Sequence, residues 1–322
     1  MNRIGTYIGA HSTRGWIRPI RAASLVVAVS VSVTWSQPQI AAVVNAASFQ
    51  SGLPAGGSLG TIFCSGLTNA TPGTFVAPSS PPLPYVLDGL NVTINNAVAP
   101  LLAVVVDSSG NAQINFQVPL ERNVLAPLNT QGQYTVSLGA CGTSVTYSAL
   151  EDPGGFFADA NGYAITQHAS DYSLVTSQNP AHPGEAIVAY ADGFFPVWPP
   201  PSIGFPTPLQ PLFQILPASQ ITESYFAGAG TSLYLQAYPP LTCGIGGTCD
   251  NSYASTPALQ VTFEGLAPGM VGVEQINFVV PANQQPGNWA LFFNQGSCPN
   301  GPGTCSRGII GTSSPYVTLP VQ

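Results

Sequence analysis

The chain has 322 residues, of which 45% are hydrophobic and only 6% are charged, whereas a typical soluble domain has about 25% charged residues. It contains no lysine, and four of its six arginines fall within the first 21 residues, while all thirteen acidic residues follow position 87. This balance excludes nucleic acids and anionic membranes as partners, because a surface with two cations cannot neutralise phosphate groups. The large hydrophobic fraction also excludes intrinsic disorder.

The first 36 residues have the layout of a secretory signal peptide. An arginine-bearing segment, 1–21, precedes the uncharged stretch 22–35, which is shorter than the ~20 residues that span a bilayer. We therefore expect residues 1–36 to be a signal peptide and the protein to be secreted or located at the cell surface, with no membrane span after signal removal. An uncleaved N-terminal anchor is the alternative.

Short strand-like segments dominate the rest of the chain. They are rich in Val, Ile, Phe and Tyr, and Gly, Pro, Asn and Ser separate them. Several alternate apolar and polar residues, as strands with one buried face do. Examples of predicted strands are 90–94, 103–106, 114–118, 134–138, 186–190, 259–263, 276–280 and 289–293. No long amphipathic helix is predicted, which indicates an all-β sandwich or barrel.

The chain also repeats itself in order. The block Q-I-N-F-Q-V-P at 113–119 recurs as Q-I-N-F-V-V-P at 275–281, and its proline is expected to end each strand. Three further matches join 90–94 with 259–263, 132–136 with 287–291, and the glycine pair Gly57 and Gly66 with Gly184 and Gly193. We therefore predict two tandem β-sandwich domains, 41–150 and 151–322, with Tyr134 and Trp289 anchoring their cores.

The second copy contains a proline-rich insertion near 195–257, predicted to be a surface excursion. Aromatic residues gather at its start, and they either bind sugar rings or a partner chain, or pack down to hold a long loop. The candidate binding residues are Phe194, Phe195, Trp198 and Phe205.

Six cysteines in an exported chain suggest disulfides. Two pairs bracket tight loops and a third would be long-range, although six cysteines allow fifteen connectivities. The preferred pairs are Cys243 with Cys249, Cys298 with Cys305, and Cys64 with Cys141. Zinc is the competing interpretation, but the chain has no C-x2-C spacing and no histidine near these pairs.

Catalytic chemistry has little support in the sequence. A Ser/His/Asp set can be assembled around His168, but no G-x-S-x-G motif is present. A glycosidase needs two neighbouring carboxylates. Four carboxylates in the second half of the chain are candidates, but we expect them to be solvated residues in turns. They are Glu185, Asp192, Glu264 and Glu274.

Calcium is a better candidate than catalysis, because oxygen-rich turns with glycine can form weak sites in exported β-domains. The candidate metal ligands are Asp107, Asp159 and Asn161. These residues lie in two turns, 107–111 and 159–162. Neither turn has the full ligand spacing of an EF-hand, and Asp and Asn also favour turns that bind no metal.

Several multi-residue blocks resemble a domain family of secreted acidobacterial proteins, first noted at the C-termini of Solibacter extracellular proteins. They are V-N-A-A-S-F at 44–49, both Q-I-N-F-x-V-P blocks, N-P-A-H-P-G-E at 179–185 and G-L-A-P-G-M-V-G at 265–272. The resemblance covers nearly all of 41–322. It implies an extracellular location and an immunoglobulin-like architecture, but no activity.

The sequence thus favours a bacterial, non-enzymatic extracellular binding or adhesion module for a polysaccharide or a cell-surface partner. A structural spacer or self-assembling surface protein is the first alternative, because low charge and exposed strand edges favour stacking. A secreted hydrolase is the weaker one.

Overall fold

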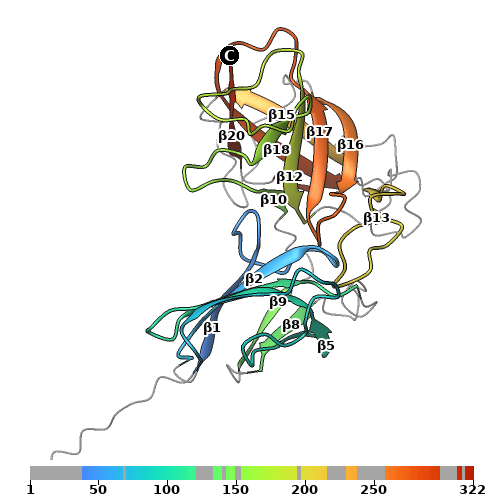
Figure 1. Cartoon of the computed structure of the whole chain (residues 1–322). Coiled ribbons are helices and arrows are strands. Elements are labelled where there is room, and N and C mark those ends of the chain that lie inside the picture. The colour runs from blue at the N-terminus through green and yellow to red at the C-terminus, as the bar shows by residue number, and fades with distance from the viewer. Residues whose placement is uncertain are drawn as a thin grey trace, which may run out of the picture. The chain divides into compact units, whose positions relative to one another are not determined.

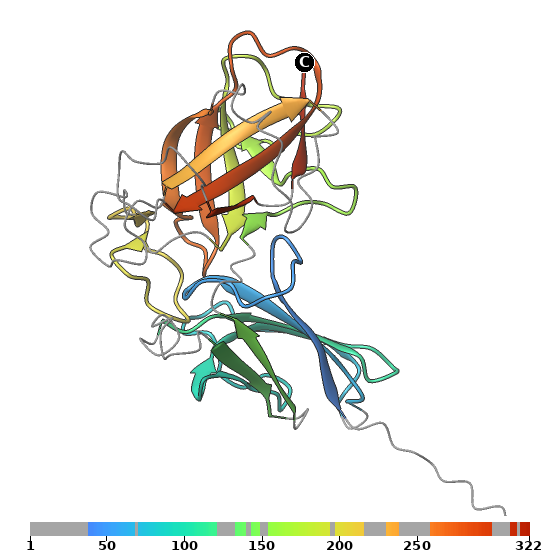
Figure 2. The same ribbon diagram turned by 180° about the vertical axis from the view of Figure 1, so that it is seen from behind.

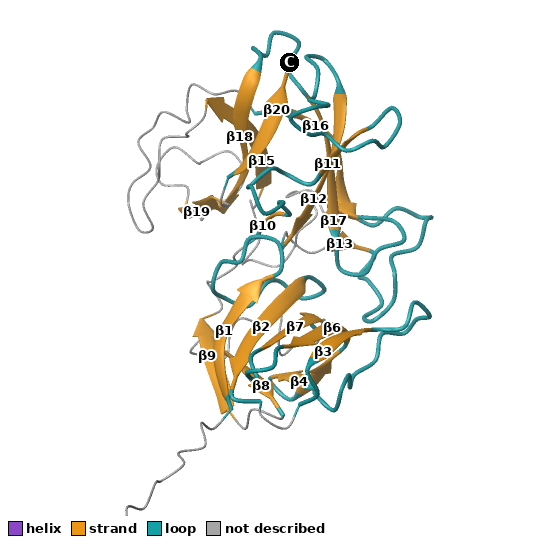
Figure 3. Cartoon of the chain, turned by 60° about the vertical axis from the view of Figure 1, so that its left-hand side comes forward, coloured by secondary structure: helices purple, strands orange, loops and turns teal. Residues whose placement is uncertain are grey.

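The computed structural model describes residues 38–67, 70–120, 133–139, 143–148, 154–193, 197–215, 230–237, 258–297, 310–313 and 316–322 (Figure 1). These residues form strands and loops and no helix (Figure 3), which confirms the predicted all-β fold class. No helix able to cross a membrane is found in this part of the chain. The predicted signal peptide, 1–36, lies outside the described residues.

Two antiparallel sheets form in the first half. The larger has the order β1-β2-β7-β6-β3, and the smaller has the order β5-β4-β8-β9. The larger sheet contains β1 (Gln39–Asn45), β2 (Leu59–Ser65), β7 (Ala112–Gln117), β6 (Leu101–Val106) and β3 (Gly73–Val76). The smaller contains β5 (Ala97–Ala99), β4 (Val92–Ile94), β8 (Gln133–Leu138) and β9 (Thr143–Ser148).

The strand alternation explains how these sheets make a core. In β7, Ile114 and Phe116 are fully buried, while Gln113 and Asn115 on the other face are partly exposed, as the two-residue period of a strand requires. The buried residues of β7 share one hydrophobic cluster with those of β4 and β8. The two sheets therefore pack face to face, as in a β-sandwich.

The second half also has two antiparallel sheets. One has the order β10-β12-β17-β16-β14-β13, with β11 paired to β12. In the other, β18 pairs with β15, β19 and β20, and β15 and β18 run side by side in Figure 2. The strands are β10 (Gly155–Phe156), β11 (Thr166–His168), β12 (Ala186–Asp192), β13 (Val197–Trp198), β14 (Gln214–Ile215), β15 (Gly230–Ala237), β16 (Gln260–Leu266), β17 (Glu274–Val279), β18 (Gly287–Ser297), β19 (Ile310–Ser313) and β20 (Val317–Val321).

The larger sheets of the two halves share one pairing pattern. β7 lies between β2 and β6, and β17 lies between β12 and β16. The bulges agree as well, since the β6–β7 register shifts opposite Asn115 and Phe116 and the β16–β17 register shifts opposite Asn277 and Phe278. Each Q-I-N-F block therefore occupies the same place in its own sheet, and each strand ends two residues before its proline.

One of the proposed sequence matches is wrong. Segment 90–94 contains β4 of the smaller first-half sheet, whereas 259–263 contributes to β16 of the larger second-half sheet. The strand equivalent to β16 is β6, as the shared bulge shows. Trp289 packs against the second core, as predicted, whereas the Tyr134 side chain is not among those described.

Candidate functional site

A proline-rich segment, 197–215, lies within the predicted insertion and is here called the strap. Its two ends pair with each other as β13 and β14, and β14 continues the sheet by pairing with β16. Of the predicted binding residues, Trp198 is 64% exposed and Phe205 is 44% exposed. Phe194 and Phe195 lie outside the described residues. The insertion also includes β15, which pairs with β18.

The strap backbone is held by the first half of the chain. The Gly204 N–H donates to Gln117 Oε1 at 2.8 Å, and the Gly204 carbonyl accepts from the Leu83 N–H at 2.7 Å. The other end of the Gln117 amide donates to the Gly57 carbonyl at 2.9 Å. Because Gln117 is fully buried, these bonds are shielded from water and fix the middle of the strap.

The second half holds the strap as well. The N–H of Thr207 donates to the Met270 carbonyl, and the N–H of Gly269 donates to the Thr207 carbonyl, both at 2.8 Å. Thr207 itself is buried. The strap is therefore anchored on both sides, although proline-rich loops have few backbone donors of their own.

The strap exposes several apolar side chains and contains no charged residue. Besides the two aromatic residues, the large exposed hydrophobic side chains here are Leu209 (71%), Leu212 (39%) and Met270 (42%). No Asp, Glu, Lys, Arg or His occurs between 193 and 222. Exposed apolar side chains mark interaction sites in soluble proteins where they form a contiguous patch. The exposed Leu209, Leu212 and Met270 could not be singled out from the sequence, because single exposed aliphatic residues are common on any protein surface.

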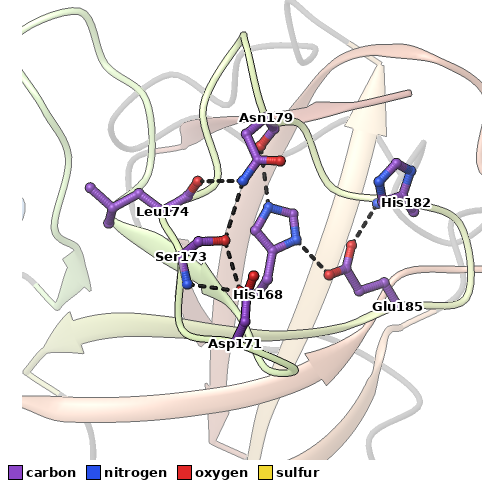
Figure 4. A network of polar contacts seen from close by, with 7 residues as sticks. All are labelled: His168, Asp171, Ser173, Leu174, Asn179, His182 and Glu185. Carbon is purple, nitrogen blue, oxygen red and sulfur yellow. Dashed lines mark hydrogen bonds and ion pairs between the residues drawn. The ribbon is translucent and has the colours of Figure 1, made fainter.

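A network of polar contacts surrounds His168, a buried residue at the end of β11 (Figure 4). Its Nδ1 lies 2.5 Å from Glu185 Oε1, and its Nε2 lies 3.2 Å from the Asn179 carbonyl oxygen. The other Glu185 oxygen accepts the His182 N–H at 2.8 Å. The ring and the carboxylate thus tie the loop 169–185 to β11 and to the start of β12.

The hydrogen-bond network around His168 does not have the geometry of a catalytic triad. A triad histidine must face a nucleophile with one nitrogen and an orienting carboxylate with the other. Here both nitrogens of His168 already contact Glu185 and a backbone carbonyl. The nearby Ser173 hydroxyl donates to Asp171 Oδ1 at 2.7 Å, so it is directed to a carboxylate rather than to the ring.

Three of the carboxylates considered for glycoside hydrolysis, Glu185, Asp192 and Glu274, are too far apart or on opposite faces of the sheet to act as a pair. Glu185 precedes this strand and Asp192 ends it, so about 23 Å of extended backbone lies between them at ~3.3 Å per residue. Glu274 lies opposite Ala191, which directs its side chain to the face opposite that of Asp192. The expectation that these groups are solvated is wrong for Asp192 (0% exposed) and Glu274 (3%), since both lie at the buried end of the sheet.

The calcium candidates lie in two separate turns. Asp107 Oδ1 accepts the N–H groups of Ser109 and Asn111, and Asp159 Oδ1 accepts those of Asn161 and Tyr163. The Asn111 side-chain amide, which also donates to the Asp107 carboxylate, and then the Asn111 N–H hold the pKa of Asp107 below the ordinary value of 3.8. The Tyr163 N–H is the main cause of the lowered pKa of Asp159. Among the described residues, no group of three or more His, Cys, Asp or Glu side chains is placed to hold a metal ion.

Cys64 is buried at the end of β2, and it is bonded in a disulfide. Its predicted partner, Cys141, and the four other cysteines, Cys243, Cys249, Cys298 and Cys305, lie outside the described residues. The three pairings stay predictions.

No protein-family model matches this chain. No curated protein matches it either. The site is therefore interpreted from its own geometry.

Proposed function

We propose that this protein is a secreted, non-enzymatic binding module made of two tandem immunoglobulin-like sandwiches, and that the strap binds a neutral polysaccharide. The observation that carries the proposal is a strap anchored from two sides that still exposes Trp198 and Phe205. Two exposed rings on a segment whose backbone is fixed give a ligand a contact area that is already in place.

The anchoring supports binding because it reduces the entropy lost on association. A loop that is fixed before the ligand arrives need not be ordered by it. Aromatic rings also supply a large contact area with few rotatable bonds. The buried Gln117 amide and the paired Thr207 backbone therefore act as supports for the exposed rings.

The chemistry of the strap favours a neutral ligand. With no charged residue between 193 and 222, the strap has nothing to pair with sulfate, phosphate or carboxylate groups. The flat apolar faces of sugar rings can stack on Trp198 and Phe205, while sugar hydroxyls remain in water. An environmental or cell-surface polysaccharide meets these requirements.

Two further features support the class of protein. The engagement of both His168 nitrogens and the separation of the carboxylates agree with a non-enzymatic role. The signal-like N-terminus and the disulfide at Cys64 agree with an extracellular location, as does the resemblance to secreted acidobacterial domains.

Affinity electrophoresis of the purified protein in gels containing dextran, soluble starch or hydroxyethyl cellulose tests this function. We expect saturable retardation in at least one neutral polymer and none in heparin. Trp198→Ala should weaken the affinity about tenfold or more, as for a central aromatic contact, whereas Tyr316→Ala, an exposed aromatic control on the second half, should not. Equal affinity of the Trp198→Ala variant and the parent would contradict the proposal.

A further inference from the structure

Two hairpin turns, one in each half, have the same hydrogen bonds. After β1, the Phe49 N–H donates to the Asn45 carbonyl, and the Asn45 N–H donates to the Gln50 carbonyl. After β11, the Tyr172 N–H donates to the His168 carbonyl, and the His168 N–H donates to the Ser173 carbonyl. The distances lie between 2.9 and 3.1 Å in all four bonds. Phe49 and Tyr172 therefore hold equivalent positions.

Both turns put an aromatic residue where glycine or asparagine is usual. Phe49 has a φ of 55° and Tyr172 a φ of 60°, in the left-handed region that side chains with a Cβ avoid. Their side chains are 58% and 67% exposed, so core packing does not compensate for the strain. A strained, exposed residue repeated in both halves points to a function.

On the strand next to each turn lies a second aromatic residue, Phe63 of β2 in the first half and Tyr190 of β12 in the second. The Phe49 and Phe63 ring centroids are 6.4 Å apart. In the second half, Gln167 links Tyr190 to the turn, since its side-chain oxygen accepts from the Tyr190 hydroxyl and its side-chain nitrogen donates to the Tyr172 backbone carbonyl. Partial burial, and then the proximity of Tyr172, raise the pKa of Tyr190.

The outward side chains of the Q-I-N-F blocks complete the pattern. Gln113 lies opposite Phe63, and Gln275 lies opposite Tyr190. In each block the glutamine donates to the asparagine two residues later, at 3.1 Å to Asn115 Oδ1 and at 2.9 Å to Asn277 Oδ1. We call each set an amide–aromatic platform. The first contains Phe49, Phe63, Gln113 and Asn115, and the second contains Tyr172, Tyr190, Gln275 and Asn277.

These bonds fix the direction of the asparagine amides. Because Oδ1 accepts from the glutamine in each platform, Nδ2 is left as a pair of donors. Within the described part of the chain, neither Nδ2 has a hydrogen-bond partner, and both asparagines are partly exposed. The glutamine Oε1 atoms add acceptors. Hydroxyl groups, which donate and accept, complement such a surface.

We propose that each amide–aromatic platform binds one segment of the same neutral polysaccharide. This inference rests on the ligand class proposed for the strap but assigns it two further sites. The residues opposite the amides across β6 and β16 are Val105, Ala103, Gly265 and Phe263, so the strand positions next to the amides carry no charged side chain. Two matching platforms on one chain suit a polymer that repeats its own unit.

The equivalent turns allow the rings to be removed without unfolding the protein. Glycine adopts the left-handed conformation freely, so the double variant Phe49→Gly/Tyr172→Gly should keep both turns. Asn96→Gly is the matched control, because Asn96 is also exposed with a φ of 71° but lies outside the platforms. Gln113→Met/Gln275→Met keeps side-chain size and removes the amides.

Affinity electrophoresis with the dextran, starch and cellulose gels tests the proposal. We expect at least tenfold weaker retardation for the double glycine variant and for the double methionine variant, and parental retardation for Asn96→Gly. Parental affinity in both double variants would overturn the platforms, even if Trp198→Ala still weakened binding. Loss in the double variants with parental affinity in Trp198→Ala would support the platforms and overturn the strap. No retardation of the parent in any neutral gel would overturn both.

Discussion

The carboxylates of Asp107 and Asp159 show how single residues shape the turns of this protein. Each accepts backbone N–H groups two and four residues ahead. The Asn111 side chain and backbone chiefly lower the pKa of Asp107, and the Tyr163 N–H chiefly lowers that of Asp159. Since both folded pKa values lie below 3.8, the stabilisation is present above that pH and is lost as the pH falls through the folded values.

The double variant Asp107→Asn/Asp159→Asn should therefore reduce the acid sensitivity of folding. Asparagine keeps the Oδ1 acceptor for the turn but does not titrate. We expect the urea midpoint of the variant to fall less than that of the parent between pH 5 and pH 2. Parallel pH profiles for the two proteins would show that these turns do not contribute to acid unfolding.

Individual residues also show where sequence analysis succeeds and where it stops. Trp198 and Phe205 are candidates from the sequence because they lie in a proline-rich, uncharged segment, and both side chains are exposed in the structure; their role in binding stays a prediction. Phe49 and Tyr172 are missed because the left-handed position of a turn is normally inferred from Gly or Asn. An aromatic residue nevertheless holds that position in both turns.

At the level of strands, apolar–polar alternation predicts the central elements well. Every predicted strand overlaps an observed one, because β7, β12 and β17 each have one face in a core. The two-residue strands β13 and β14 are missed, since two residues carry no periodicity. The mismatch of 90–94 with 259–263 arises because both segments alternate in the same way, and alternation does not say which sheet a strand joins.

The pairing of β14 with β16 depends on one glycine of β16. A Cβ on Gly265 would lie 2.1 Å from the Phe213 carbonyl oxygen and 2.9 Å from Gln214 Cα, so backbone atoms of β14 would have to move. Gly265→Ala should separate β14 from β16 and break the bond from the Leu266 N–H to the Phe213 carbonyl.

We expect Gly265→Ala to increase proteolysis within 197–215 and to weaken polysaccharide retardation several-fold, although the exposed rings are unchanged. Gln260→Ala, an exposed substitution on the same strand, is the control and should behave like the parent. Parental protease resistance in the Gly265→Ala variant would show that β14 tolerates the added methyl group.

In the whole molecule, the two halves share buried polar contacts as well as the strap. The described residues belong to one compact unit. In it, Asp192 Oδ1 accepts the Leu59 N–H at 2.8 Å, and the Asp192 carbonyl accepts from Asn45 Nδ2 at 3.4 Å. Asp192 and Asn45 are fully buried. Sequence analysis treats Asp192 as a solvated turn residue, because no local pattern shows that another strand will cover it.

Removing this carboxylate should destabilise the whole unit. In Asp192→Ala the Leu59 N–H loses its acceptor while Leu59 stays buried, and an unsatisfied buried donor costs about 1–3 kcal/mol. Asp192→Asn retains an Oδ1 acceptor and should lose less. Equilibrium urea unfolding followed by tryptophan fluorescence measures both. Equal free energies of unfolding for the alanine variant and the parent would mean that water replaces the carboxylate, and hence that this contact between β2 and β12 opens readily in solution.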